Sequence, residues 1–254
     1  MVEKGGRNII LITKQKDFSA SQTQISCELA QARLVVYQLL SSGYCQSPDI
    51  DTVRKLLSNQ MINLMMHLST KKQTNNQVSE GLKLINEFVQ QSLKLELNEV
   101  QTLLAVEYTK LLRGLKPGYG PQPPYESIYR SINKQPSQKI LREIRSFYTQ
   151  LGVSLTLKDQ PDFIGLEFDL MRYLIEKEVE AWEKNQVDEA VRSLQTQWEF
   201  LNKHLACWVP EFCKIMYDHT CEKYYKGLAL ITIGYIADDL LQLKNELESA
   251  KFSF

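Results

Sequence analysis

The sequence lacks an excess of charge of either sign, because its 30 Lys and Arg residues balance its 30 Asp and Glu residues. A neutral chain has no bulk field that would draw it to nucleic acid or to an anionic membrane. Long hydrophobic runs are also missing. The apolar run within Asn8–Thr13 is too short to span a bilayer, and no small-residue cleavage site follows it. These absences argue against nucleic-acid binding and membrane insertion, and we expect a cytoplasmic protein.

Cysteine and histidine are sparse. The five cysteines are an odd number at no regular spacing in a chain of 254 residues, which favours reduced thiols in a cytoplasm over a disulfide framework. One group lies close together in sequence but shows none of the tight paired spacings of a structural zinc site; it consists of His204, Cys207, Cys213, His219 and Cys221. We interpret these residues as ordinary helical side chains and expect no metal site.

Motifs of catalysis are missing as well. There is no Glu-x-x-His pair for a di-iron bundle, no glycine-rich phosphate loop and no nucleophile elbow. Asp238-Asp239 resembles the aspartate-rich signature of isoprenoid synthases, but the third carboxylate is absent. We interpret the pair as a solvated patch. An all-α enzyme of the isoprenoid-synthase type that uses Asp238 and Asp239 remains the alternative from another functional class.

Helical periodicity dominates what is present. Apolar residues recur at steps of three and four along most of the chain, whereas only Val153–Leu157 alternates like a strand. The first expected helix runs from Ser21 to Gly43 and should bury Ile25, Leu29, Ala32, Val36 and Leu40. Further helices are expected at 48–68, 82–93, 100–114, 136–151, 164–182, 187–207, 212–217 and 221–249, with a break at Val209-Pro210.

These segments predict an all-α fold. We expect an N-terminal arm over residues 1–21 and a helical domain over residues 22–254. That domain is either one large unit or two helical subdomains joined within residues 113–137.

The helix that follows Lys158 is expected to be central, because it is apolar over more than half its circumference. Asp159 or Gln160 can cap it, Pro161 fits its first turn, and Asp162 suits the positive end of its dipole. Glu167 points a carboxylate toward the apolar arc, where burial is costly without a partner. We expect a tyrosine hydroxyl or an arginine to satisfy it.

Residues 113–133 are rich in proline and glycine, with Tyr119, Tyr125 and Tyr129 set among them. One interpretation is a rigid linker, across which two halves could exchange between protomers. The other is a binding edge, because prolines preset the backbone and tyrosines offer contact area at low entropic cost. Composition leaves both open.

Three blocks resemble the TorD-like family of cytoplasmic molybdoenzyme maturation chaperones, which includes the DmsD and NarJ types. The first is Glu107–Leu112 followed by Pro123–Tyr129, similar to the family's tyrosine-leucine helix and its proline-tyrosine-glutamate-serine segment. The second is Pro161-Asp162-Phe163 and the helix after it. The third comprises Phe200–His204, Trp208, Pro210 and Phe212, and the residues compatible with the family's first helix are Arg33, Tyr37 and Leu40. The sequence departs from the family at Phe163, where a histidine is usual, and at Leu112, where a phenylalanine is usual.

The resemblance implies a non-enzymatic chaperone that binds the twin-arginine signal peptide or the apo-form of a molybdenum-containing oxidoreductase and assists cofactor insertion and export. The sequence shows no motif for a cofactor, catalytic residue or metal of the protein's own, and we expect a monomer or a homodimer, which could be domain-swapped across residues 113–137. The residues carried over as client-binding are Tyr108, Leu112, Pro123, Pro124, Tyr125, Glu126, Ser127, Tyr129, Asp159, Pro161, Asp162, Phe163 and Glu167. An assembly scaffold that binds no peptide is a further alternative.

The two proline-containing stretches are expected to pack together, so that Tyr125, Glu126, Asp162 and Phe163 line one groove with an acidic lip. Such a lip would complement two arginines followed by an apolar stretch. Asp162 is expected either to cap a helix or to bind an arginine.

Overall fold

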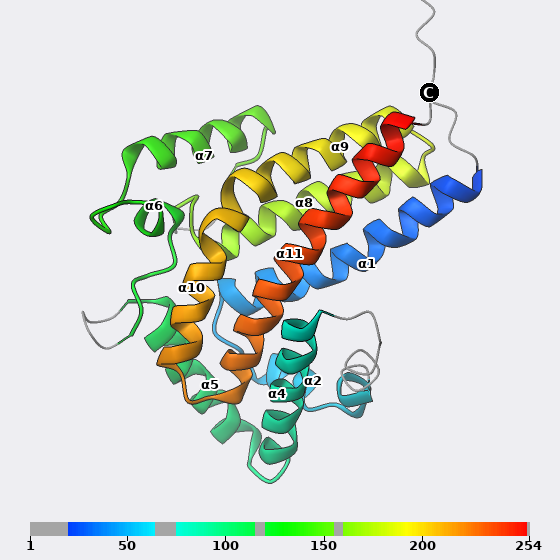
Figure 1. Ribbon diagram of the computed structural model, residues 1–254. Coiled ribbons are helices and arrows are strands. Elements are labelled where there is room, and N and C mark those ends of the chain that lie inside the picture. The colour runs from blue at the N-terminus through cyan, green and yellow to red at the C-terminus, as the bar shows by residue number, and fades with distance from the viewer. Residues whose placement is uncertain (1–19, 64–74, 115–119, 155–159, 253–254) are drawn as a thin grey trace, which may run out of the picture.

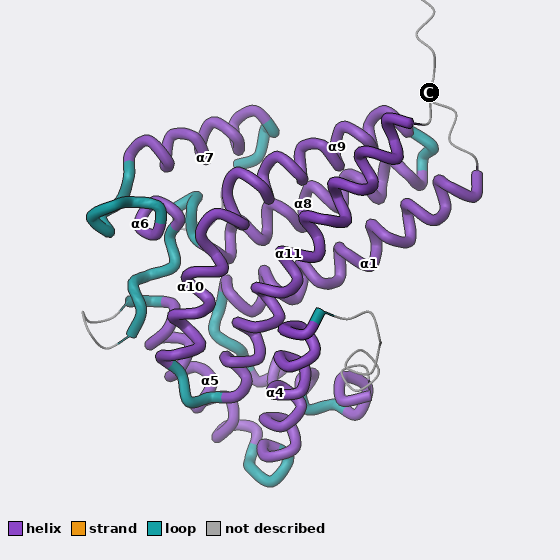
Figure 2. The backbone as a smooth tube through the Cα atoms, in the orientation of Figure 1, coloured by secondary structure: helices purple, strands orange, loops and turns teal. Residues whose placement is uncertain are grey.

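The computed structural model describes residues 20–63, 75–114, 120–154 and 160–252. Every regular element in these ranges is a helix (Figures 1 and 2), which confirms the all-α prediction. In chain order the elements are α1 (Ala20–Cys45), α2 (Ile50–Leu56), α4 (Asn76–Ser92), α5 (Leu97–Leu112), α6 (Glu126–Tyr129), α7 (Gln138–Gln150), α8 (Ile164–Glu183), α9 (Val187–Phe200), the π-helical turn η1 (Leu201–Leu205), α10 (Ala206–His219) and α11 (Lys223–Phe252). Most of the predicted arm and of the Val153–Leu157 segment lies outside the described residues.

Helix α8 lies in the centre of the molecule, as its apolar circumference predicts. Most of its side chains are buried, between α1 on one side and α9 on the other. Helix α11 packs against α4, α9 and α10 and closes the bundle (Figure 1). Helices α4, α5, α7 and α11 occur close to where the periodicity places them.

The predicted buried face of α1 is wrong in its first half. Ile25 is 47% exposed and Leu29 is 39% exposed, whereas Arg33 and Tyr37 on the adjacent face are buried. Gly43 does not end this helix, which continues to Cys45. The apolar pattern indicates the wrong face because the buried face of α1 includes polar side chains that make hydrogen bonds to other helices.

Those contacts centre on the Arg33 guanidinium, which is 2% exposed and joins four helices. It donates from Nε to Asp239 Oδ1 at 2.6 Å, from Nη1 to Glu178 Oε2 at 3.1 Å and from Nη2 to Gln197 Oε1 at 2.5 Å. Tyr37 donates its hydroxyl to Asp239 Oδ2 at 2.7 Å. The solvated-patch interpretation is therefore wrong for Asp239, which is 1% exposed and has both oxygens engaged.

The predicted break at Pro210 is also wrong, because α10 runs through this residue. Proline removes one helical hydrogen bond and its ring collides with the carbonyl four residues earlier. Here the π turn η1 immediately precedes α10 and changes the helical register upstream of the proline. Trp208 and Phe212 on either side of Pro210 are buried, so their packing keeps the helix continuous.

Helices α4 and α11 approach each other backbone to backbone at two glycines. A Cβ atom on Gly81 would lie 2.6 Å from the carbonyl oxygen of Gly227, and a Cβ on Gly227 would lie 2.5 Å from the carbonyl oxygen of Gly81. Real Cβ atoms do not approach this closely, so only glycine fits at both positions.

Candidate functional site

The segment from Pro121 to Tyr129 lies directly against the start of α8. Ile164 donates its backbone N–H to Pro124 O at 3.0 Å, and Glu126 donates its own to Asp162 O at 3.0 Å. Tyr125 and Phe163 form an isolated antiparallel bridge, with ring centroids 5.6 Å apart. Proline has no backbone N–H to donate, and this pairing uses only the carbonyl oxygen of Pro124. The predicted close packing of the two stretches is confirmed.

The start of α8 differs from the prediction. The helix begins at Ile164 with Phe163 at its N-cap, without a side-chain capping bond; Pro161 precedes it, and Asp159 lies outside the described residues. The Phe163 ring is fully buried, and the Arg113 guanidinium carbon lies 5.2 Å from its centroid. The residue in place of the family's histidine thus packs as a core aromatic under a cation.

Asp162 caps a helix, but not its own. Its Oδ2 accepts the backbone N–H of Ser127 at 3.0 Å, which satisfies a free donor in the first turn of α6. The side chain is 0% exposed, and burial raises the pKa of this carboxyl. Asp162 therefore fixes the proline–tyrosine segment onto α8.

Glu126 and Glu167 complete a buried acidic cluster. Glu126 accepts from His204 Nδ1 at 2.9 Å and from Arg130. Glu167 accepts from Trp208 Nε1 at 3.1 Å, so the expected tyrosine or arginine partner is wrong. Burial, and then the neighbouring Glu126 charge, raise the pKa of Glu167 well above its usual value. The sequence prediction missed His204 and Trp208 as partners, although both belong to the third family-like block.

The acidic lip expected at this site is not on the surface. Glu126 and Asp162 are both 0% exposed, so neither carboxylate reaches a peptide on the surface of this conformation. The exposed charges nearby belong to Arg113 and Arg130. Of the remaining predicted site residues, Pro123 and Tyr125 are half-buried. Those that are buried are Tyr108, Leu112, Pro124, Ser127, Tyr129, Pro161 and Phe163.

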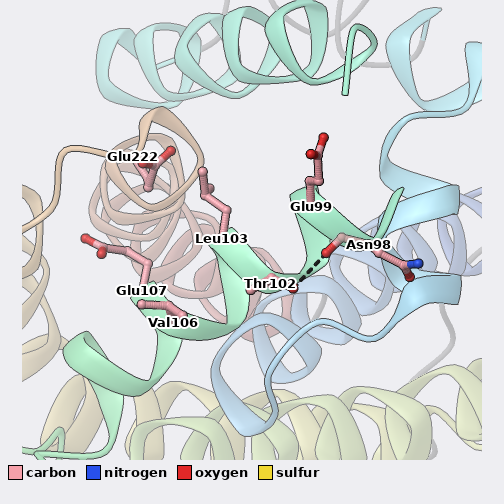
Figure 3. A pocket seen from close by; sticks show the side chains of 7 residues that line it. All are labelled: Asn98, Glu99, Thr102, Leu103, Val106, Glu107 and Glu222. Atoms are coloured by element: carbon pink, nitrogen blue, oxygen red, sulfur yellow. Dashed lines mark hydrogen bonds between the residues drawn. The ribbon is translucent and has the colours of Figure 1, made fainter. Parts of the chain in front are cut away.

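An acidic and apolar hollow of about 600 Å³ does reach the surface, along the outer side of α5. Figure 3 shows Leu103 between Glu222, which precedes α11, and Glu99. The lining residues are Asn98, Glu99, Thr102, Leu103, Val106, Glu107 and Glu222. Lys110 pairs with Glu107 at 3.0 Å, and partial burial together with Glu107 raises the pKa of Glu222. Three carboxylates against one ammonium leave this hollow acidic.

The family model for the nitrate reductase delta subunit matches residues 71–214. This span includes α5, the proline–tyrosine segment, α8 and the acidic cluster. The chain belongs to the nitrate reductase delta subunit family. The resemblance found in the three sequence blocks is thereby confirmed.

Relatives of this family member carry the name chaperone protein TorD. The protein of Vibrio cholerae serotype O1 strain M66-2 is 22% identical over 217 residues, which cover 83% of this chain and 91% of the relative. That of Vibrio atlanticus strain LGP32 is 27% identical over 127 residues, 48% of this chain and 57% of the relative. The isoprenoid-synthase alternative is wrong for this family member, since Asp239 is bound to Arg33 and Tyr37.

All five cysteines of this chain are free thiols, as predicted from their number. Across the ranges that the structure describes, no group of three His, Cys, Asp or Glu side chains is arranged to hold a metal ion. None of the described helices is both long and apolar enough to cross a bilayer.

Glu167→Gln is expected to change how stability depends on pH. The folded protein keeps the Glu167 proton above the ordinary pKa of 4.5, where the unfolded chain has lost it. The free energy of unfolding should therefore fall as pH rises from 4.5 toward the folded pKa, by up to about 1.4 kcal/mol per pH unit. Glutamine cannot ionise, so Glu167→Gln should lose this slope in urea titrations between pH 4.5 and 8. The exposed Glu180→Gln is the control, and parallel curves for wild type and Glu167→Gln would contradict the assignment.

Proposed function

We propose that the protein is a maturation chaperone for a molybdenum-containing oxidoreductase, and that it binds the twin-arginine signal peptide or the apo-form of that client. The match to TorD chaperones over 83% of the chain carries this proposal. In this role the protein would hold the client until its molybdenum cofactor is inserted and export can begin. A chaperone of this kind needs a peptide site and no catalytic group.

We place the peptide along α5. The acidic hollow offers Glu107 and Glu222 to the arginines, beside Leu103 and Val106, and Val106 is 57% exposed. The residues just after α5 lie against the proline–tyrosine segment. Gly114 is so close to Pro123 that a Cβ on the glycine would lie only 2.3 Å from Pro123 Cγ. Pro123 and Tyr125 would then meet the apolar stretch, and the buried acidic cluster positions them. Guanidinium groups form strong charge-assisted bonds with carboxylates, which supports this orientation.

The test is calorimetry with the client's leader peptide. Wild type is expected to bind the twin-arginine peptide more tightly than a twin-lysine version, since lysine lacks the planar fork of donors. The double variant Glu107→Gln with Glu222→Gln should weaken binding about tenfold or more through lost charge-assisted bonds. The matched control is Glu211→Gln, an exposed acid that pairs with Lys134 elsewhere, and it should bind like wild type.

The possible results of this experiment distinguish the proposed function from the proposed position of the peptide on the protein. Equal binding by wild type and the double variant would move the peptide away from the hollow. If no leader peptide binds while the client's body still co-purifies, the protein is an assembly scaffold. If neither associates with the chain, the proposed function is wrong.

A further inference from the structure

The outer side of α1 carries an apolar stripe, interrupted by Glu28, that no described helix covers. Ile25, Leu29, Val35 and Leu39 are 47%, 39%, 52% and 54% exposed. Ala32 lies exposed in the middle of this stripe. The spacings of three and four place these side chains on one helical face. Figure 1 shows α1 along one edge of the layer that it forms with α8, α9 and α11.

This face is also almost free of charge. Glu28 is the single ionisable side chain among the exposed positions from Ser21 to Ser42, and the other polar ones are glutamine or serine. The exposed sides of other helices differ, since α7 carries the pair Lys139–Glu143 and α9 carries Arg192–Glu189. A helix that faces solvent normally presents charged groups opposite its core. An exposed apolar face with so little charge indicates a protein contact.

The order of residues along the stripe indicates which partner covers it. Ile25 and Leu39 lie seven residues on either side of Ala32, and Leu29 and Val35 lie three residues on either side. The stripe therefore has nearly the same pattern in both directions. A second α1 laid antiparallel across it would set Ile25 against the partner's Leu39 and Leu29 against the partner's Val35. Ala32 would meet itself on the two-fold axis, where its small side chain permits close approach.

We propose that the chain forms a homodimer through antiparallel packing of α1 against α1 of a second copy. The stripe from Ile25 to Leu39 is about 21 Å long, because its ends are 14 positions apart at a rise of about 1.5 Å each. One helix pair of this length buries less than a standard interface, so the dimer is expected to dissociate in the micromolar range. The symmetric pattern matches a second α1 better than a cationic leader peptide, because Glu28 is the single carboxylate that this face offers.

Sedimentation equilibrium of the full chain, from about 1 to 200 μM, is the first test. Wild type should pass from monomer to dimer over this range. Leu29→Glu should weaken the dimer about a hundredfold or more, because two-fold symmetry buries the new carboxylate twice. The control Leu241→Glu changes a side chain on α11 that is 61% exposed, and it should dimerise like wild type.

Disulfide trapping tests the axis independently. In a background with Cys207→Ser and Cys221→Ser, which removes the exposed thiols, Ala32→Cys should oxidise to a covalent dimer. Cysteines on the axis come within disulfide range of each other. Gln38→Cys, exposed on another side of the same helix, should not.

A monomer at every concentration overturns the proposal, as does a dimer that Leu29→Glu leaves intact. The latter outcome would favour exchange of halves across residues 113–137. A monomeric wild type whose leader-peptide affinity falls in Leu29→Glu would assign the stripe to the client instead.

Discussion

Arg33→Ala is expected to lower the free energy of unfolding by about 3–5 kcal/mol. The guanidinium is 2% exposed, and its removal leaves Asp239 and Glu178 in the interior without their cation. Burial already raises the pKa of Glu178, and Arg33 opposes that rise. The variant should therefore unfold at lower urea concentration and take up a proton on folding near neutral pH.

Urea unfolding followed by circular dichroism measures this effect. The control is Arg54→Ala, whose partner Asp51 is 75% exposed; a surface pair of this kind contributes little, so its midpoint should match wild type. A loss below about 1 kcal/mol in Arg33→Ala would mean that water or a rearranged side chain replaces the guanidinium.

Trp208→Ala is expected to cost about 3–5 kcal/mol, the range for truncating a large buried aromatic residue. The indole is 1% exposed, lies 5.5 Å from the Tyr129 ring between centroids, and donates to Glu167. Its loss removes packing beneath the proline–tyrosine segment and leaves the Glu167 carboxyl without its described donor. We therefore expect leader-peptide affinity to fall together with stability.

Trp208→Phe separates the two contributions, because phenylalanine keeps most of the packing but cannot donate. Chemical denaturation should place it between wild type and Trp208→Ala. If Trp208→Phe is as stable as wild type, the hydrogen bond to Glu167 contributes nothing. If instead it equals Trp208→Ala, the hydrogen bond dominates over the packing.

Local patterns predict the helices well but not the side chains that join them. The periodicity that predicts α8 also places Glu167 on its buried side, because both follow from helical geometry alone. The nearest partner of Arg33 in sequence lies 145 positions away and the farthest 206, so no local pattern distinguishes a buried arginine from an exposed one. The periodicity accordingly predicts Ile25 and Leu29 in the core, although both are exposed.

The acidic cluster shows the same limit at shorter range. Asp162 and Ser127 are 35 positions apart, and the sequence places Asp162 at a helix start without showing that the helix is α6. The family-like blocks named His204 and Trp208, but not their contacts with Glu126 and Glu167. Pro210 was predicted to break the helix because the neighbouring π turn has no sequence signature.

The contact between Gly81 and Gly227 bears on when the chain can fold during its synthesis. Helix α4 meets α11 through these glycines, and α1 depends on Asp239 of the same helix. Helix α11 is the last helix in the described sequence, so it leaves the ribosome after all the others. Until then α4 lacks the surface that buries it and Arg33 of α1 lacks Asp239. Early segments with exposed apolar surface are prone to aggregate. Completion of this helical bundle therefore waits until α11 has been synthesised.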